Sequence, residues 1–168
     1  MATEHNNLSE YNKDLIPNAS QMSFGIVVSE WNENITFNLL KGAYDTLVEN
    51  GVLEENIIVK YVPGTYELPI ATQLMFEHTT VDAQIAIGSV IQGETKHFDF
   101  VCEATTQGIK DVNLKYGKPV IFCVLTDNNL QQAIDRSGGK HGNKGIECAV
   151  AAIKMVAFKN GLVLAKRD

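Results

Sequence analysis

An apolar run at 85–91 is followed by Gly93, Thr95 and His97. Residues of these types can bind an anion or transfer a proton. Residues 85–91 are mostly apolar and β-branched, which is typical of a strand buried on both faces of a parallel sheet. If Gly93, Glu94 and Thr95 form the turn into a helix, their backbone N–H groups and the helix dipole favour an anion such as phosphate. His97 would stand beside that anion, and imidazole suits proton transfer near neutral pH. A structural turn with a surface histidine would give the same short pattern.

A second segment with residues suited to chemistry is the glycine-rich, basic stretch at 135–145, which leads into an apolar helical pattern. Arg136 stands beside several glycines, so its guanidinium could approach a phosphate and bind two of its oxygens. Lys140, His141 and Lys144 add positive charge to the same stretch. The alternative interpretation is a solvated connection between two helices.

Apolar blocks alternate with helical patterns along the chain, and these are the elements that must position the two segments. The expected strands are 24–28, 57–62, 83–91 and 120–125, and the expected helices are 33–50, 68–77, 98–116, 128–136 and 145–160. This alternation predicts right-handed βαβ crossovers and a parallel sheet with helices on both faces.

Ligands of such sheets bind beyond the carboxyl ends of the strands, so the residues at these ends are candidates for a site. The ends are 29–32, 62–67, 92–97 and 126–128. Trp31 could stack on a planar ring there, or it could be an ordinary hydrophobic anchor. Glu67 could accept hydrogen bonds from a polyol or an amine, or it could simply complement the dipole of the following helix.

Length and composition favour one soluble domain. The 168 residues, 45% of them hydrophobic, fit a single domain at 21–168 preceded by a polar, flexible arm at 1–20. No run is long enough to span a membrane, the arm lacks a signal-peptide core, and the three cysteines lie in apolar patterns, so we expect a cytoplasmic protein. The net charge of −6 argues against nucleic-acid binding, and the four scattered histidines predict no metal site.

Four segments together resemble the lumazine synthase family over roughly residues 24–158. They are SEWN at 29–32, VPGTYELP at 62–69, GSVIQGETKHFDFV at 88–101, and the block 119–150 that ends in DRSGGKHGNKGIECAV. The resemblance implies a three-layer α/β/α sandwich with a parallel, flavodoxin-like central sheet. It also implies a step of riboflavin biosynthesis in which 5-amino-6-(D-ribitylamino)uracil condenses with 3,4-dihydroxy-2-butanone 4-phosphate. The products are 6,7-dimethyl-8-ribityllumazine, phosphate and water, and no metal or organic cofactor is expected.

The resemblance also implies a role for individual residues of this sequence. Trp31 would stack on the pyrimidine, the segment Thr65, Tyr66 and Glu67 would hold the ribityl-bearing substrate, and Ser89, Val90 and Ile91 would offer backbone polar groups. Glu94 and Thr95 match the phosphate-binding turn, where the backbone N–H groups would bind and the Glu94 carboxylate would point away. His97 would transfer protons; Phe122 and Arg136 would come from the neighbouring subunit, and Lys144 would line the same site. Gln92 departs from the family pattern, because many members carry an arginine there.

Assembly is a further expectation from the resemblance. The family places each active site between adjacent subunits of a pentamer, and the short loop at 138–145 favours a capsid of 60 subunits over a free pentamer. Association with riboflavin synthase is also expected. Two alternatives are a flavodoxin-like flavin-binding module and a non-catalytic homologue that only forms capsids.

Overall fold

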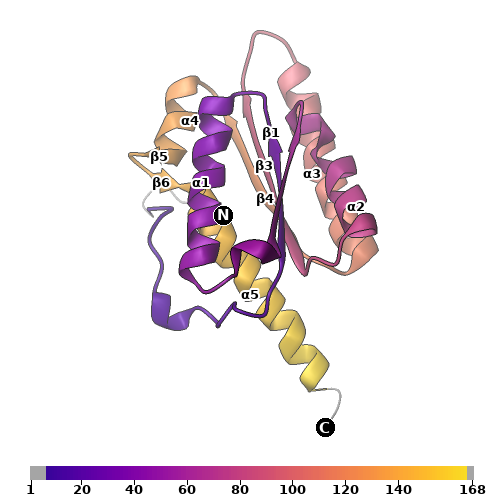
Figure 1. The fold of residues 1–168 in the computed structure, drawn as a ribbon. Helices are drawn as coiled ribbons and strands as arrows, with labels where there is room; N and C mark the ends of the chain where they lie inside the picture. Colours follow the sequence, from indigo (N-terminus) through magenta and orange to yellow (C-terminus); the bar gives the residue numbers. More distant parts are fainter. Residues whose placement is uncertain (1–6, 166–168) are drawn as a thin grey trace.

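A four-stranded parallel sheet forms the centre of the protein (Figure 1). The computed structural model describes residues 7–165, so 1–6 of the predicted arm and 166–168 of the predicted domain lie outside the described residues. The strands are β1 (Phe24–Ser29), β2 (Ile57–Val62), β3 (Ala83–Ile91) and β4 (Val120–Asp127), in the order β2-β1-β3-β4. The chain winds outward from β1 to β2 and then crosses back to β3 and β4. The direction of winding therefore reverses between β1 and β3.

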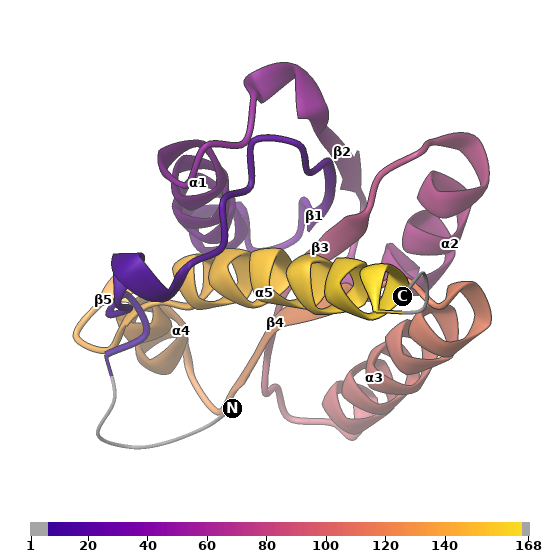
Figure 2. The same cartoon turned by 90° about the horizontal axis from the view of Figure 1, so that it is seen from below.

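Helices cover both faces of this sheet, as Figure 2 shows. One face packs against α1 (Glu33–Glu49), α4 (Leu130–Arg136) and α5 (Lys144–Leu164), and the other against α2 (Leu68–His78) and α3 (His97–Tyr116). Side chains alternate along each strand, so Ile26 and Val28 point into the first core and Val27 points into the second. The predicted three-layer α/β/α sandwich with a parallel, flavodoxin-like sheet is confirmed.

The predicted bounds were right for two strands and differed by a few residues elsewhere. β2 and β3 have the expected limits, whereas β4 runs on to Asp127 because it stays paired with β3 up to Ile91. Helix α4 begins at Leu130, two residues later than expected, because the Asn129 side chain caps it by accepting a 3.0 Å hydrogen bond from the backbone N–H of Gln132.

The glycine-rich stretch contains a small antiparallel hairpin that the sequence did not predict. Its strands are β5 (Ser137–Gly139) and β6 (Gly142–Asn143). Gly138 and Gly142 have φ values of 120° and 83°, which side chains other than glycine rarely allow. These two glycines permit the tight reversal, and so short a hairpin has no room for the alternation that normally reveals strands.

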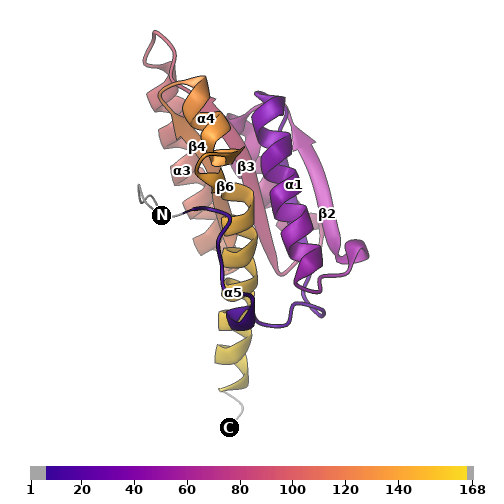
Figure 3. The same cartoon turned by 90° about the vertical axis from the view of Figure 1, so that its left-hand side faces the viewer.

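The described part of the predicted arm lies along the side of the molecule that carries α1 and α5. The backbone N–H of Leu8 donates to His141 O at 2.8 Å, and the N–H of Asn143 donates to Ser9 Oγ at 2.9 Å. The ammonium of Lys13 lies 3.3 Å from a carboxylate oxygen of Glu49. These contacts seat the segment on the hairpin and on the end of α1. In Figure 3 the last turns of α5 extend beyond the sheet.

Candidate active site at the carboxyl edge of the sheet

The reversal of winding between β1 and β3 marks the place where a ligand is expected in an open parallel sheet. β1 and β2 end level, since Ser29 pairs with Val62, and β3 and β4 end level, since Ile91 pairs with Asp127. Val28 pairs with Ile87, so β3 and β4 run three residues farther than β1 and β2. The side chain of Asn32 bridges the two central strands, because its Nδ2 donates to the carbonyl oxygen of Ser89 at 2.9 Å. The sequence-predicted residues on β1, β2 and β3 therefore share one edge, at the top of Figure 1.

Trp31 is presented to solvent by a turn that the neighbouring strand holds in place. The N–H groups of Glu30 and Trp31 donate to Val62 O and Pro63 O at 2.8 and 3.2 Å. Asn32, the next residue, adopts the left-handed conformation with φ 59° and ψ 47°, which an asparagine tolerates better than most residues. The indole is 71% exposed, so its face is available for stacking.

The segment Thr65–Glu67 forms a short 3₁₀ helix, η3, between β2 and α2. Thr65 is buried, and its carbonyl oxygen accepts a 3.2 Å hydrogen bond from the Thr105 hydroxyl of α3. Its side chain packs so closely on β3 that a Cβ on Gly88 would lie 2.7 Å from Thr65 Oγ1. Thr65 therefore anchors the segment, while Tyr66 is exposed and Glu67 is half-buried at the edge.

Ser89, Val90 and Ile91 close β3 at the same edge. Ser89 is buried, and its hydroxyl oxygen has no hydrogen-bond partner within residues 7–165. Its carbonyl oxygen already accepts from Asn32, which uses one of the two lone pairs. Val90 and Ile91 are half-buried. The end of β3 thus offers polar groups next to Asn32, the residue that follows Trp31.

The predicted phosphate turn rises above the sheet between β3 and α3 (Figure 1). Residues 92–97, which include Glu94 and Thr95, are all exposed. The turn starts where the N–H of Gln92 donates to Asp127 O at 2.9 Å, and it ends where the N–H of His97 donates to Thr95 Oγ1 at 3.4 Å. His97 is the first residue of α3, a helix of 20 residues. N–H groups of a helix terminus and an exposed imidazole therefore stand together, as an anion site with a proton-transfer residue requires.

The other three predicted residues lie on or beside the edge strand β4. Phe122 is five residues before the end of β4, roughly 16 Å below the carboxyl edge at the usual rise per residue. Arg136 ends α4, and its Nη1 donates to Gln132 O at 3.1 Å. Lys144 begins α5, where its ammonium lies 2.9 Å from each carboxylate oxygen of Glu147. One chain therefore does not bring Phe122 to the edge where Trp31 lies.

Asp127 and Asn32 lie in the predicted strand ends 126–128 and 29–32, but the sequence alone assigned no function to either residue. Asp127 is 5% exposed, and its Oδ1 lies 3.9 Å from Arg136 Nη1. Burial raises the pKa of its carboxyl group, and the Arg136 guanidinium offsets part of that rise. A polar residue as the last member of a buried strand was the available signal for Asp127.

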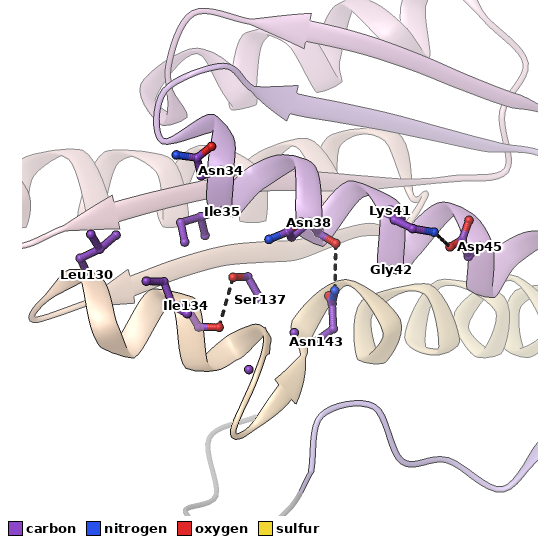
Figure 4. Close-up of a pocket in the computed structure, with 12 residues that line it drawn as sticks. Asn34, Ile35, Asn38, Lys41, Gly42, Asp45, Leu130, Ile134, Ser137 and Asn143 are labelled. Atoms are coloured by element: carbon purple, nitrogen blue, oxygen red, sulfur yellow. Dashed lines mark hydrogen bonds and ion pairs between the residues drawn. The ribbon is translucent and has the colours of Figure 1, made fainter.

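A separate groove of about 640 Å³ lies between α1, α4 and the hairpin (Figure 4). Its lining is mostly polar or small, and Lys41 in it is paired with Asp45. In Figure 4, Asn143 reaches across to the backbone of α1, where its Nδ2 donates to Asn38 O at 2.8 Å. None of the sequence-predicted site residues lines this groove.

Among the described residues, no three His, Cys, Asp or Glu side chains are grouped as a metal ion requires. Within residues 7–165, no helix has the length and the apolar character of a membrane span.

Comparison with known proteins matches nearly the whole chain to one family. The sequence model described as 6,7-dimethyl-8-ribityllumazine synthase matches residues 21–160. Proteins with that name are 60% identical in Christiangramia forsetii, over 95% of both chains, and 62% identical in Flavobacterium johnsoniae, over 95% of this chain and 84% of that one. The protein of that name in Phocaeicola vulgatus is 53% identical over 96% of both chains. The chain therefore belongs to the 6,7-dimethyl-8-ribityllumazine synthase family.

Proposed function

We propose that this protein condenses 5-amino-6-(D-ribitylamino)uracil with 3,4-dihydroxy-2-butanone 4-phosphate to give 6,7-dimethyl-8-ribityllumazine, phosphate and water, in riboflavin biosynthesis. The observation that carries this proposal is that one edge of the sheet, at its switch point, bears an exposed indole after β1 and an exposed helix terminus with His97 after β3. Family membership gives the substrates. The edge offers a stacking face for the pyrimidine and N–H donors for the phosphate.

Each group has a task in this reaction. The 5-amino group attacks the ketone and forms an imine with loss of water, and the imine then loses phosphate by elimination. The ribitylamino nitrogen closes the second ring on the remaining carbonyl carbon with loss of a second water. Trp31 stacks on the pyrimidine, and Thr65, Tyr66 and Glu67 with the end of β3 (Ser89, Val90 and Ile91) orient the ribityl-bearing substrate. The turn at Glu94 and Thr95 binds phosphate through its N–H groups, and Arg136 and Lys144 add positive charge. His97 moves protons during the elimination. Positioning of two reactants supplies much of the remaining acceleration.

The site is proposed to be shared between two chains. Phe122 and Arg136 lie on or beside the edge strand β4, which a neighbouring chain can approach, whereas Trp31 and His97 follow the central strands. Large apolar side chains are also exposed over several elements and would be covered by assembly: Trp31, Tyr66, Phe100, Leu114 and Phe158. We propose a pentamer, and a capsid of 60 subunits built from twelve of them.

Four further expectations belong to the same proposal. The protein works in the cytoplasm, it needs no cofactor, and riboflavin synthase associates with it as the enzyme that takes up its product. The chain is divided into an arm at 1–20 and a single working domain at 21–168.

Sedimentation of the purified protein tests the assembly, because a mass of five chains would contradict the capsid and a monomer would also contradict the shared site.

The activity is tested by mixing the purified protein with both substrates and following the lumazine absorbance and the release of phosphate. Both signals should appear together, and neither should appear when either substrate is left out. Absence of turnover in an assembled protein would support the capsid-only alternative. Tightly bound flavin without turnover would support the flavodoxin-like alternative, which no observation here favours.

A further inference from the structure

A buried carboxylate lies next to the arginine that is proposed to bind phosphate. Asp127 is 5% exposed at the end of β4, and its Oδ1 lies 3.9 Å from Arg136 Nη1. Its other oxygen, Oδ2, is buried without a hydrogen-bond partner in the part of the chain that the structure describes. A buried carboxylate with one oxygen left without a hydrogen bond is unfavourable for folding, so its place beside Arg136 calls for a reason other than stability.

The sheet fixes the backbone that carries the Asp127 carboxylate. Its Cα pairs with Ile91 in the ladder between β3 and β4, and its carbonyl oxygen accepts the 2.9 Å hydrogen bond from Gln92 N–H. The backbone of Asp127 is therefore tied to the first residue of the phosphate turn. Its side chain is buried and extends from a fixed backbone at the edge of the sheet, rather than from a surface loop.

The Arg136 guanidinium is held on one side only. Its Nη1 donates to Gln132 O at 3.1 Å and faces Asp127, while its Nε and Nη2 bond to no residue in 7–165. The side chain is 38% exposed. A separation of 3.9 Å exceeds hydrogen-bond length, so Asp127 acts on Arg136 through charge attraction. The remaining donors are left for a phosphate, which a guanidinium binds through two parallel hydrogen bonds.

We infer that Asp127 is a positioning residue that holds the Arg136 guanidinium in the orientation that receives the phosphate of the butanone substrate. The inference rests on the proposed function, because it concerns the same phosphate. The proposed role is indirect, since the carboxylate would repel the phosphate if the two were in contact.

The test is Asp127→Asn, which keeps the size of the side chain and removes its charge. The KM for the phosphorylated butanone should rise about 3- to 10-fold, while kcat and the KM for the pyrimidine should stay within about twofold. Asp127→Glu keeps the charge and should stay within about threefold of the wild type. If Asp127→Asn does not fold, the charge-retaining variant still decides, because a tenfold or larger rise in its KM for the butanone would overturn the inference.

Asp135→Asn is the matched control. Asp135 is next to Arg136 on the same helix, but its Oδ1 accepts a 2.9 Å hydrogen bond from Gln131 Nε2. The same loss of charge there should leave both KM values unchanged. An equal rise in the two variants would show a general charge effect and overturn the role of Asp127.

A double variant separates positioning from folding and from the proposed function. Arg136→Ala alone should raise the KM for the butanone, and adding Asp127→Asn to it should cause no further rise. If Arg136→Ala raises this KM and Asp127→Asn does not, the positioning role is wrong and the phosphate role of Arg136 stands. If Arg136→Ala leaves the KM for the butanone unchanged, the phosphate role of Arg136 is wrong, and the positioning role of Asp127 is wrong as well.

Discussion

The side-chain amide of Asn32 and the carbonyl oxygen of Ser89 join the two central strands by a 2.9 Å hydrogen bond at the point where the sheet reverses its winding. The bond links the turn that carries Trp31 to the strand that ends in the phosphate turn. Asn32 makes it from a left-handed backbone conformation. This side chain therefore adds to the ladder between β1 and β3 in fixing the two halves of the proposed pyrimidine site relative to each other.

Replacing Asn32 should separate its hydrogen bond from its backbone conformation. Asn32→Ala and Asn32→Gly both lose the bond to Ser89, but only alanine resists the left-handed conformation. We expect the alanine variant to be less stable than the glycine variant by about 1 kcal/mol in chemical unfolding. Both variants should show a raised KM for the pyrimidine. An unchanged KM in both variants would show that the hydrogen bond from Asn32 to Ser89 has no part in substrate binding.

Gly88 should be intolerant of even one added methyl group. A Cβ there would lie 2.7 Å from Oγ1 and 2.9 Å from Cγ2 of Thr65, which is buried and cannot move freely. Gly88→Ala should destabilise the protein by about 1–3 kcal/mol and should weaken pyrimidine binding, because the segment at 65–67 must shift. Gly93→Ala is the control, since its Cβ would meet nothing within 4 Å. A Gly88→Ala protein as stable as the control would contradict the close packing of Thr65 on β3.

Asp127 should make stability depend on pH in a predictable direction. Burial raises the pKa of its carboxyl group in the folded protein, against a partial opposing effect of Arg136. The folded state therefore holds this proton to higher pH than the unfolded chain does. The stabilisation is complete below the ordinary carboxyl pKa of about 3.9 and is lost as the pH rises through the raised folded-state value.

Asp127→Asn removes this titration, and all other ionisable groups are common to the two proteins. The free energy of unfolding of the variant, minus that of the wild type, should therefore increase as the pH rises above about 4, the ordinary carboxyl pKa. Urea unfolding of both proteins at several pH values measures this difference in the free energy of unfolding. A difference that decreases over this range would mean that the folded protein favours the charged form of Asp127.

Replacement of His97 by alanine should slow turnover while both substrates still bind. The imidazole is exposed at the start of α3, so its loss leaves the turn and the sheet intact. We expect kcat to decrease by up to about 10²-fold with little change in either KM, as for the loss of a general acid–base group. His78→Ala is the control, because His78 is exposed at the far end of α2. An unchanged kcat in the His97→Ala protein would exclude the proton-transfer role.

The sequence was sufficient for the elements whose residues repeat with a clear period. The run from Ala83 to Ile91 is mostly apolar and rich in β-branched residues, and it forms β3 with the predicted limits. The predicted strand end at 29–32 also lies at the carboxyl edge of the sheet, as expected. The hairpin at Ser137–Asn143 was not predicted, because it depends on positive φ values at two glycines rather than on a hydrophobic pattern.

Contacts between segments distant in sequence were beyond the reach of pattern reasoning. The bond from Asn32 to Ser89 spans 57 positions and depends on the strand order. The proximity of Asp127 to Arg136 depends on the length and capping of α4. Periodicity gives the faces of single elements, whereas such pairs are determined only when the elements pack together.

The most direct test of the shared site is complementation between two defective variants. If His97 of one chain and Arg136 of its neighbour act on the same substrates, then co-assembled His97→Ala and Arg136→Ala chains, mixed equally, should contain about a quarter of sites with both native residues. Lumazine formation, measured at a butanone phosphate concentration well below the KM of the Arg136→Ala protein, should then clearly exceed the average of the two parent variants. Activity no higher than that average would show that both residues act from the same chain, and would contradict the two-chain site.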